Sequence, residues 1–161
     1  MNFYRIVALL NILMLTGCAN VSAIFTDTVI DYETTVKMGT KDAVATLEEL
    51  TMTQHPNWRP ERFEIKDDYA YWSYGSVIEN DMYGRAEKIV GSSERIYYRT
   101  INKVRLMKWQ RKFKDWYVVS LINSDGGVIK HVFYSRDINL AKRYVDAANS
   151  ALVAYKKIDK L

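Results

Sequence analysis

Cysteine, proline and histidine are scarce in this chain of 161 residues. Its single cysteine excludes an intramolecular disulfide, and two histidines beside one thiol are too few ligands for a typical protein metal centre. The only prolines, Pro56 and Pro60, interrupt the chain at one place. No apolar run approaches the roughly 20 residues that a membrane-spanning helix needs. The fold must therefore be stabilised by packing, to which an abundance of Tyr and Trp contributes.

The cysteine directly follows the apolar run that opens the chain. One positive charge, Arg5, precedes the run Ile6–Leu15, which has the short length typical of a secretory signal. The run ends in LTGC (15–18). This motif resembles the lipobox of bacterial lipoproteins, in which leucine, a small or polar residue, and glycine or alanine precede the cysteine.

The lipobox resemblance implies a processed and lipidated amino terminus. Residues 1–17 would be removed, and Cys18 would carry diacylglycerol on its sulfur and a fatty acyl chain such as palmitate on its amino group. Two or more chains hold a protein firmly on a bilayer. In that family an aspartate after the cysteine signals inner-membrane retention, so Ala19 implies the periplasmic leaflet of the outer membrane. The alternative is an unmodified Cys18 packed in an ordinary N-terminal helix.

The remaining chain has the size of one domain. Removal of residues 1–17 leaves 144 residues, for which we predict a tether over 18–28 and one globular domain over 29–157. Charge divides this chain into two parts, because residues 19–93 carry a net charge of −6 and residues 94–161 a net charge of +9.

Hydrophobic periodicity predicts a mainly β domain with one helix near each end. Alternation over Ile30–Met38 predicts an opening strand, and helical spacing predicts a short helix over 40–52. The β-rich runs over 63–135 predict an antiparallel meander, in which Ser124–Gly127 is the clearest turn. A change of period after residue 135 predicts a C-terminal amphipathic helix.

The run from about residue 63 to residue 155 resembles the pleckstrin-homology-like fold of bacterial proteins. The resemblance is carried by four segments: ERIYYRTINKV (94–104), WYVVSL (116–121), VFYS (132–135) and AANSAL (147–152). It implies an α+β, mainly β fold with a partly open antiparallel barrel capped by the C-terminal helix. The strand and helix predicted over 30–52 depart from that pattern. An α+β sandwich with its helices on one face fits the same order of elements.

A basic run provides the candidate binding surface. Between Glu94 and Lys114 there are eight Lys and Arg residues and one acidic residue. If the region is one strand, Arg99, Lys103 and Arg105 share its odd-numbered face, while Lys108 approaches a hairpin tip. Such a surface would attract anionic lipid headgroups or an envelope polymer. The alternative is a set of solvated charges that protects a strand edge. An exported, acylated protein is not expected to meet nucleic acid.

The loop HPNWRP (55–60) provides a second candidate, Trp58. Aromatic and arginine side chains often dominate interfaces, so Trp58 beside Arg59 is typical of an exposed recognition tip. The alternative is that Trp58 folds back and covers apolar residues.

No pattern in the sequence predicts catalysis. The pairs Glu48–Glu49 and Asp67–Asp68 are typical of a solvated helix face and a turn, and Ser92 follows glycine without a nucleophile elbow. We therefore predict a periplasm-facing lipoprotein that is not an enzyme, needs no metal or other cofactor, and acts as a binding or scaffolding module for an envelope protein. The alternative function is binding of anionic lipid or polymer through the basic run.

Overall fold

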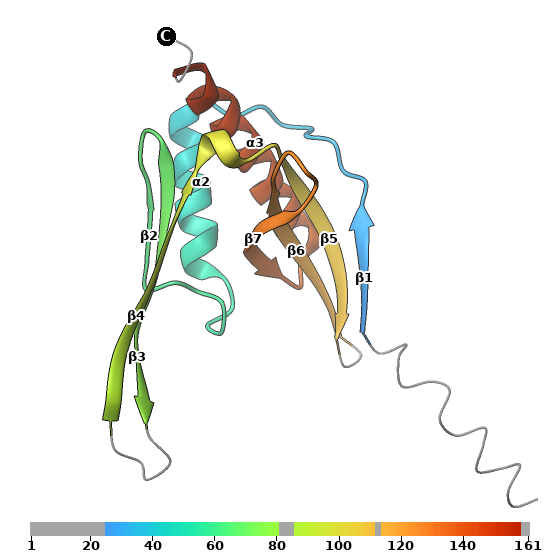
Figure 1. Ribbon diagram of the computed structural model, residues 1–161. Coiled ribbons are helices and arrows are strands. Elements are labelled where there is room, and N and C mark those ends of the chain that lie inside the picture. Colours follow the sequence, from blue (N-terminus) through green and yellow to red (C-terminus); the bar gives the residue numbers. More distant parts are fainter. Residues whose placement is uncertain (1–24, 81–85, 112–113, 159–161) are drawn as a thin grey trace, which may run out of the picture.

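The computed structural model describes residues 25–80, 86–111 and 114–158. Cys18 and the predicted signal segment (1–17) lie outside these residues. The elements, which Figure 1 shows in chain order from blue to red, are β1 (Phe25–Ile30), α2 (Thr40–Thr53), β2 (Arg62–Ile65), β3 (Tyr69–Asn80), β4 (Ala86–Tyr97), the 3-10 turn η2 (Tyr98–Thr100), β5 (Lys103–Arg111), β6 (Lys114–Ile122), β7 (Val128–Ser135) and α3 (Ile138–Ile158).

The strands form two antiparallel sheets. One has four strands in the order β1-β5-β6-β7, and the other has three in the order β2-β3-β4. The sheets share no strand, so the described strands form no closed barrel. Figure 1 shows that the two sheets approach each other near η2 and spread apart toward the β3–β4 and β5–β6 hairpins. The helices α2 and α3 pack together at the end where the sheets are close.

The predicted class, α+β and mainly β with a C-terminal amphipathic helix, is confirmed. The helix predicted over 40–52 is α2, and the predicted turn over Ser124–Gly127 joins β6 to β7. Gly126 in that turn has φ +82°, a conformation that side chains with a Cβ rarely adopt.

The predicted strand over Ile30–Met38 is wrong. The strand at this place is β1, which starts at Phe25 within the segment assigned to the tether and pairs with β5. Residues 31–39 belong to no strand and form a strap between β1 and α2. Apolar and polar residues alternate in this segment because one side of the strap lies against α3. The contact includes a hydrogen bond from the Met38 backbone N–H to Ser150 Oγ at 3.1 Å.

Asp146 of α3 fastens the strap. This carboxylate is 4% exposed and accepts hydrogen bonds from the Tyr32 hydroxyl at 3.0 and 3.1 Å and from the Thr35 backbone N–H at 3.2 Å. Hydrogen bonds to a charged group contribute about 1.5–3 kcal/mol each. The strap therefore connects the first strand firmly to the C-terminal helix.

The core lies between the sheets and the two helices. The inner stripe of α3 follows the predicted helical spacing, with Tyr144, Ala148 and Leu152 buried. The helix packs against β5, β6 and β7, where the Phe133 ring stacks on the Tyr144 ring with centroids 4.8 Å apart and planes 12° from parallel. This packing leaves the opposite face of the four-stranded sheet free for side chains of another kind.

Candidate functional site

The face of the four-stranded sheet that is turned away from α3 carries a layer of aromatic side chains. Strand alternation places Trp109, Trp116 and Tyr134 on this outer face, since Leu106 and Phe133 belong to the core face. Beneath them Val118 and Ser120 are fully buried, although they lie on the outer face. Longer side chains of β5 and β7 therefore cover the centre of the sheet.

Trp58 completes this aromatic layer. Its ring stacks on Tyr134 with centroids 4.5 Å apart and planes at 13°, and it meets Trp116 edge-on at 4.5 Å. The loop is joined to β7 just before this point, because the Tyr134 backbone N–H donates to Gln54 Oε1 at 3.2 Å. Of the two sequence-based interpretations, the structure therefore favours the one in which Trp58 folds back, and its ring remains half-buried.

A pocket opens beside these rings at the edge of β7. Its volume is about 200 Å³, and we call it the aromatic pocket. It is lined from α2, the 53–55 segment, β6, β7 and the start of α3, by Leu50, Thr53, Gln54, His55, Trp116, Phe133, Tyr134, Ser135, Arg136 and Leu140. The space suits one side chain or one small ring, since it is below the range of about 300–1,000 Å³ that is usual for drug-sized ligands.

Two polar groups distinguish the aromatic pocket from a packing gap. The Arg136 guanidinium lies over the Trp116 ring, 5.5 Å from its centroid, and the Arg136 side chain is exposed. Burial, with a smaller effect of Tyr74, raises the pKa of Tyr134 to about 12, so its hydroxyl remains a neutral hydrogen-bond donor. Arg136 and Tyr134 thus add a cation and a hydroxyl-bearing ring to the apolar lining of the pocket.

Trp116, Tyr134 and Arg136 were not predicted from the sequence as site residues. The available signal was the pair of tryptophans on either side of the β5–β6 hairpin tip, because Trp109 and Trp116 face each other in register. The third partner, Trp58, is far away in the chain and gives no local sign of this contact.

The basic candidates do not form one surface. Arg99 lies in η2, before β5 begins, and its guanidinium stacks over the Tyr97 ring at 5.2 Å. Lys103 and Arg105 share the odd-numbered face of β5 as predicted, whereas Lys108 points to the other face, where its ammonium is 2.7 Å from Asp115. The predicted grouping of all four is corrected because η2 turns the chain between Arg99 and Lys103.

Ser120 and His131 share a hydrogen bond on the outer face, with Oγ and Nδ1 2.8 Å apart. A serine beside an imidazole is part of the arrangement that nucleophilic enzymes use. Here the serine side chain has no exposed surface, so a substrate has no access to its oxygen. The pair therefore anchors β7 to β6 and does not support a hydrolase.

The acid sensitivity of the fold should depend on His131. Burial lowers the pKa of this imidazole below its ordinary value of 6.5. The nearby Lys130 lowers this pKa further, and Asp27 raises it, but burial is the largest effect. Between the two values the unfolded chain binds more protons, so the free energy of unfolding should decrease as the pH falls through 6.5. Urea unfolding on either side of this pH should show a smaller decrease for His131→Asn, which keeps an acceptor for Ser120. An equal decrease in both proteins would exclude His131 as the cause.

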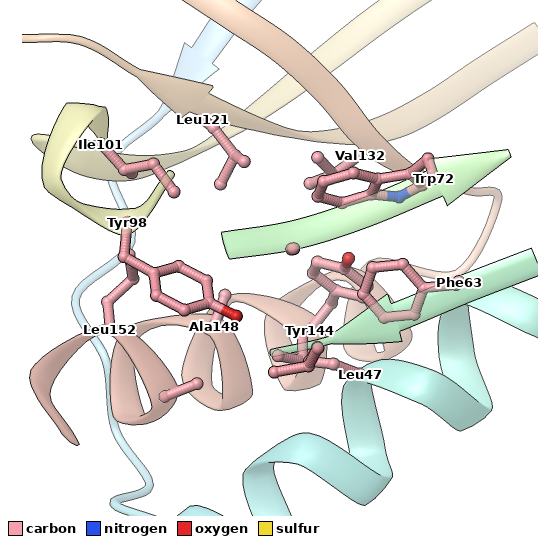
Figure 2. A pocket seen from close by; sticks show the side chains of 13 residues that line it. Leu47, Phe63, Trp72, Tyr98, Ile101, Leu121, Val132, Tyr144, Ala148 and Leu152 are labelled. Carbon is pink, nitrogen blue, oxygen red and sulfur yellow. The ribbon is translucent and has the colours of Figure 1, made fainter. Parts of the chain in front are cut away.

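A second hollow lies inside the core and has an apolar lining. Figure 2 shows this cavity, whose volume is about 40 Å³, between the three-stranded sheet, both helices and the inner face of the four-stranded sheet. The Tyr144 hydroxyl on its border is 3.2 Å from Thr51 Oγ1, and burial raises the pKa of that hydroxyl. The Tyr98 hydroxyl donates to the Lys66 and Tyr69 carbonyls. The cavity is therefore a space in the packing rather than a site for chemistry.

Within the described ranges, no three His, Cys, Asp or Glu side chains come together as metal ligands. The helices of that part of the chain are also too short or too polar to cross a membrane. No protein-family model, curated protein or solved structure matches this chain. The candidate function therefore depends on the lipobox and on the aromatic pocket.

Proposed function

We propose that this protein is a noncatalytic binding module of the cell envelope, anchored through lipid on Cys18 to the periplasmic leaflet of the outer membrane, and that the aromatic pocket is its binding site. The observation that carries the binding role is that Trp116, Tyr134 and Arg136 line one half-open hollow, while the Trp58 ring packs on the first two of these side chains. Tryptophan, tyrosine and arginine are the residues that dominate binding energy in protein interfaces.

The chemistry of the aromatic pocket favours a protein as the partner. Its volume accommodates one apolar side chain, and the rings around it supply a large contact area at a low cost in conformational entropy. Arg136 at the rim suits a carboxylate, because a guanidinium binds a carboxylate through two parallel hydrogen bonds. The expected partner segment therefore presents an apolar residue next to an aspartate or glutamate.

The alternative of a lipid or polymer binder that uses the basic run has less support. Lys108 is paired with Asp115, and Arg99 lies over an aromatic ring away from β5. Of the four candidates, Arg99 and Lys108 thus lie apart from the odd-numbered face of β5 that carries Lys103 and Arg105.

The arrangement of strands supports a pleckstrin-homology-like scaffold for this module. Without β1, the two antiparallel sheets have three strands each, and they are followed by a C-terminal helix that packs on β5, β6 and β7, in the order of elements that this fold implies. The strand β1, which joins the later sheet, and the helix α2 are additions to the pattern. We infer a variant of the scaffold in which α2 fills the space between α3 and the three-stranded sheet.

Photocrosslinking in cells tests the binding role of the aromatic pocket. A photoreactive residue in place of Leu140, which is 39% exposed and lines the pocket, should capture one partner protein. With that partner purified, Trp116→Ala should weaken the affinity by about 30-fold, the effect of a hot-spot residue worth 2 kcal/mol.

The control for this experiment is Val153, which is 59% exposed on α3 and lies outside the aromatic pocket. A photoreactive residue at this position should capture no such partner, and Val153→Ala should leave the affinity unchanged. Thermal unfolding of Trp116→Ala checks that the domain remains folded. An unchanged affinity of folded Trp116→Ala would exclude the pocket as the binding site.

A further inference from the structure

The position of β1 shows where the domain is joined to its tether. Phe25, the first residue of β1, pairs in register with Arg111, the last residue of β5, and Arg111 pairs with Lys114, the first residue of β6. The chain therefore enters the domain beside the tip of the β5–β6 hairpin. We call this end of the four-stranded sheet the tether end. In Figure 1 the β3–β4 hairpin extends toward the same side.

The tryptophans are concentrated at the tether end. Trp109 and Trp116 face each other two residues from the ends of β5 and β6, and Trp58 packs on Trp116. The fourth tryptophan, Trp72, is 2% exposed and belongs to the core. Three of the four tryptophans in the sequence thus gather, half-buried, at the end where the chain enters the domain.

Basic side chains accompany these rings. The Arg111 guanidinium lies over the Trp109 ring, 4.8 Å from its centroid, and pairs with Asp27 at 2.5 Å, whereas Lys114 is exposed at the start of β6. The far end of the same sheet lacks such a cluster of rings, since the β6–β7 turn there carries no aromatic residue; the exposed Lys103 and Asp125 lie at that end. Tryptophan with arginine and lysine is the combination found where proteins meet the headgroup region of a bilayer.

The length of the tether keeps the tether end close to the membrane. Seven residues lead from Cys18 to the start of β1, a span of at most about 25 Å when fully extended. The nine residues of β6 cover a similar distance of about 30 Å. A lipid on Cys18 therefore holds the tether end no farther from the headgroups than the length of β6. The headgroups are thus a surface that the rings and cations of the tether end can reach.

We infer that the tether end, through Arg111, Lys114 and the exposed edges of its half-buried tryptophan rings, rests on the phospholipid headgroups of the leaflet that holds the anchor, with the β6–β7 turn pointing away from the membrane. The inference rests on the proposed lipidation of Cys18. It also deepens the proposed function, because the aromatic pocket shares Trp116 with this end of the domain. The partner of the pocket would then be a protein attached to, or embedded in, the same membrane.

Fluorescence quenching in vesicles tests this orientation. Because the only native cysteine would be blocked by lipid, a new cysteine can be labelled selectively in the lipidated protein. Lys114→Cys and Asp125→Cys place an environment-sensitive fluorophore at the two ends of β6. In vesicles of phosphatidylethanolamine and phosphatidylglycerol that contain a headgroup-nitroxide phospholipid, the label at position 114 should be quenched several-fold more strongly than the label at position 125. Thr26→Cys, an exposed position on β1, should behave like position 114.

The outcomes separate this inference from the lipid anchor itself. Protein that sediments with the vesicles but shows equal quenching at both ends, or stronger quenching at position 125, overturns the orientation and leaves the anchor intact. Protein that does not sediment with the vesicles overturns the anchor and, with it, the orientation. If Lys114→Cys does not fold, Thr26→Cys compared with Asp125→Cys decides between the same outcomes.

Discussion

Replacing Cys18 by serine is expected to move the protein from the membrane fraction to the soluble periplasm. The variant should carry an ordinary cleavable secretory signal in place of residues 1–17, so that an uncleaved apolar run does not act as an anchor. Each buried methylene of an acyl chain contributes about 0.8 kcal/mol, and a serine hydroxyl does not receive the thioether-linked diacylglycerol. Fractionation of cells and immunoblotting would measure the change.

Ala19→Asp is the matched control for the anchor. By resemblance to lipoprotein sorting signals, this variant should keep its lipid but be retained in the inner membrane. The protein should therefore remain membrane-bound and differ only in which of the two membranes holds it. Mass spectrometry of the natural protein's mature N-terminus gives the decisive check. An unmodified thiol at Cys18, or a serine variant that still sediments with membranes, would contradict the proposed anchor.

Phe133→Ala is expected to cause the largest loss of stability. The Phe133 side chain is 2% exposed and stacks on Tyr144 at the contact between β7 and α3. Removal of a buried phenylalanine ring costs about 3–5 kcal/mol through lost burial and the cavity that remains. A domain of this size has a total stability of about 5–15 kcal/mol, so the variant should unfold at a much lower urea concentration.

Leu140→Ala provides the comparison at an exposed position on α3. Leu140 is 39% exposed, and substitutions at exposed positions usually change the free energy of unfolding by about 0.5 kcal/mol or less. Both variants should be compared in the soluble Cys18→Ser form by urea unfolding, with tryptophan fluorescence as the signal that reports unfolding. A cost below about 1 kcal/mol for Phe133→Ala would mean that α3 is held to the sheet mainly by other contacts.

The two helices and the strands β5 to β7 could be predicted from the sequence alone. The spacing of Tyr144, Ala148 and Leu152 predicted α3, and these residues are buried where the helix meets the sheets. The β-rich runs after residue 102 became β5, β6 and β7, joined at the predicted turn. Such patterns are readable because a helix and a strand each impose a fixed period on the residues that face the core. The LTGC motif likewise carries the prediction of an anchor within four adjacent residues.

Long-range pairing was decided only by the tertiary structure. Half-buried positions alternate with exposed ones at Ile30, Tyr32 and Thr34, so this stretch has the period of a strand, although it is a strap that lies along α3. A period of two shows that one side of an extended chain is covered, but not whether a sheet or a helix covers it. The aromatic pocket depends on the same kind of information, because Trp58 meets Trp116 and Tyr134 only after the chain has folded around the edge of β7. Contacts of this kind are selected by the burial of the whole domain, and no spacing within a single segment encodes them.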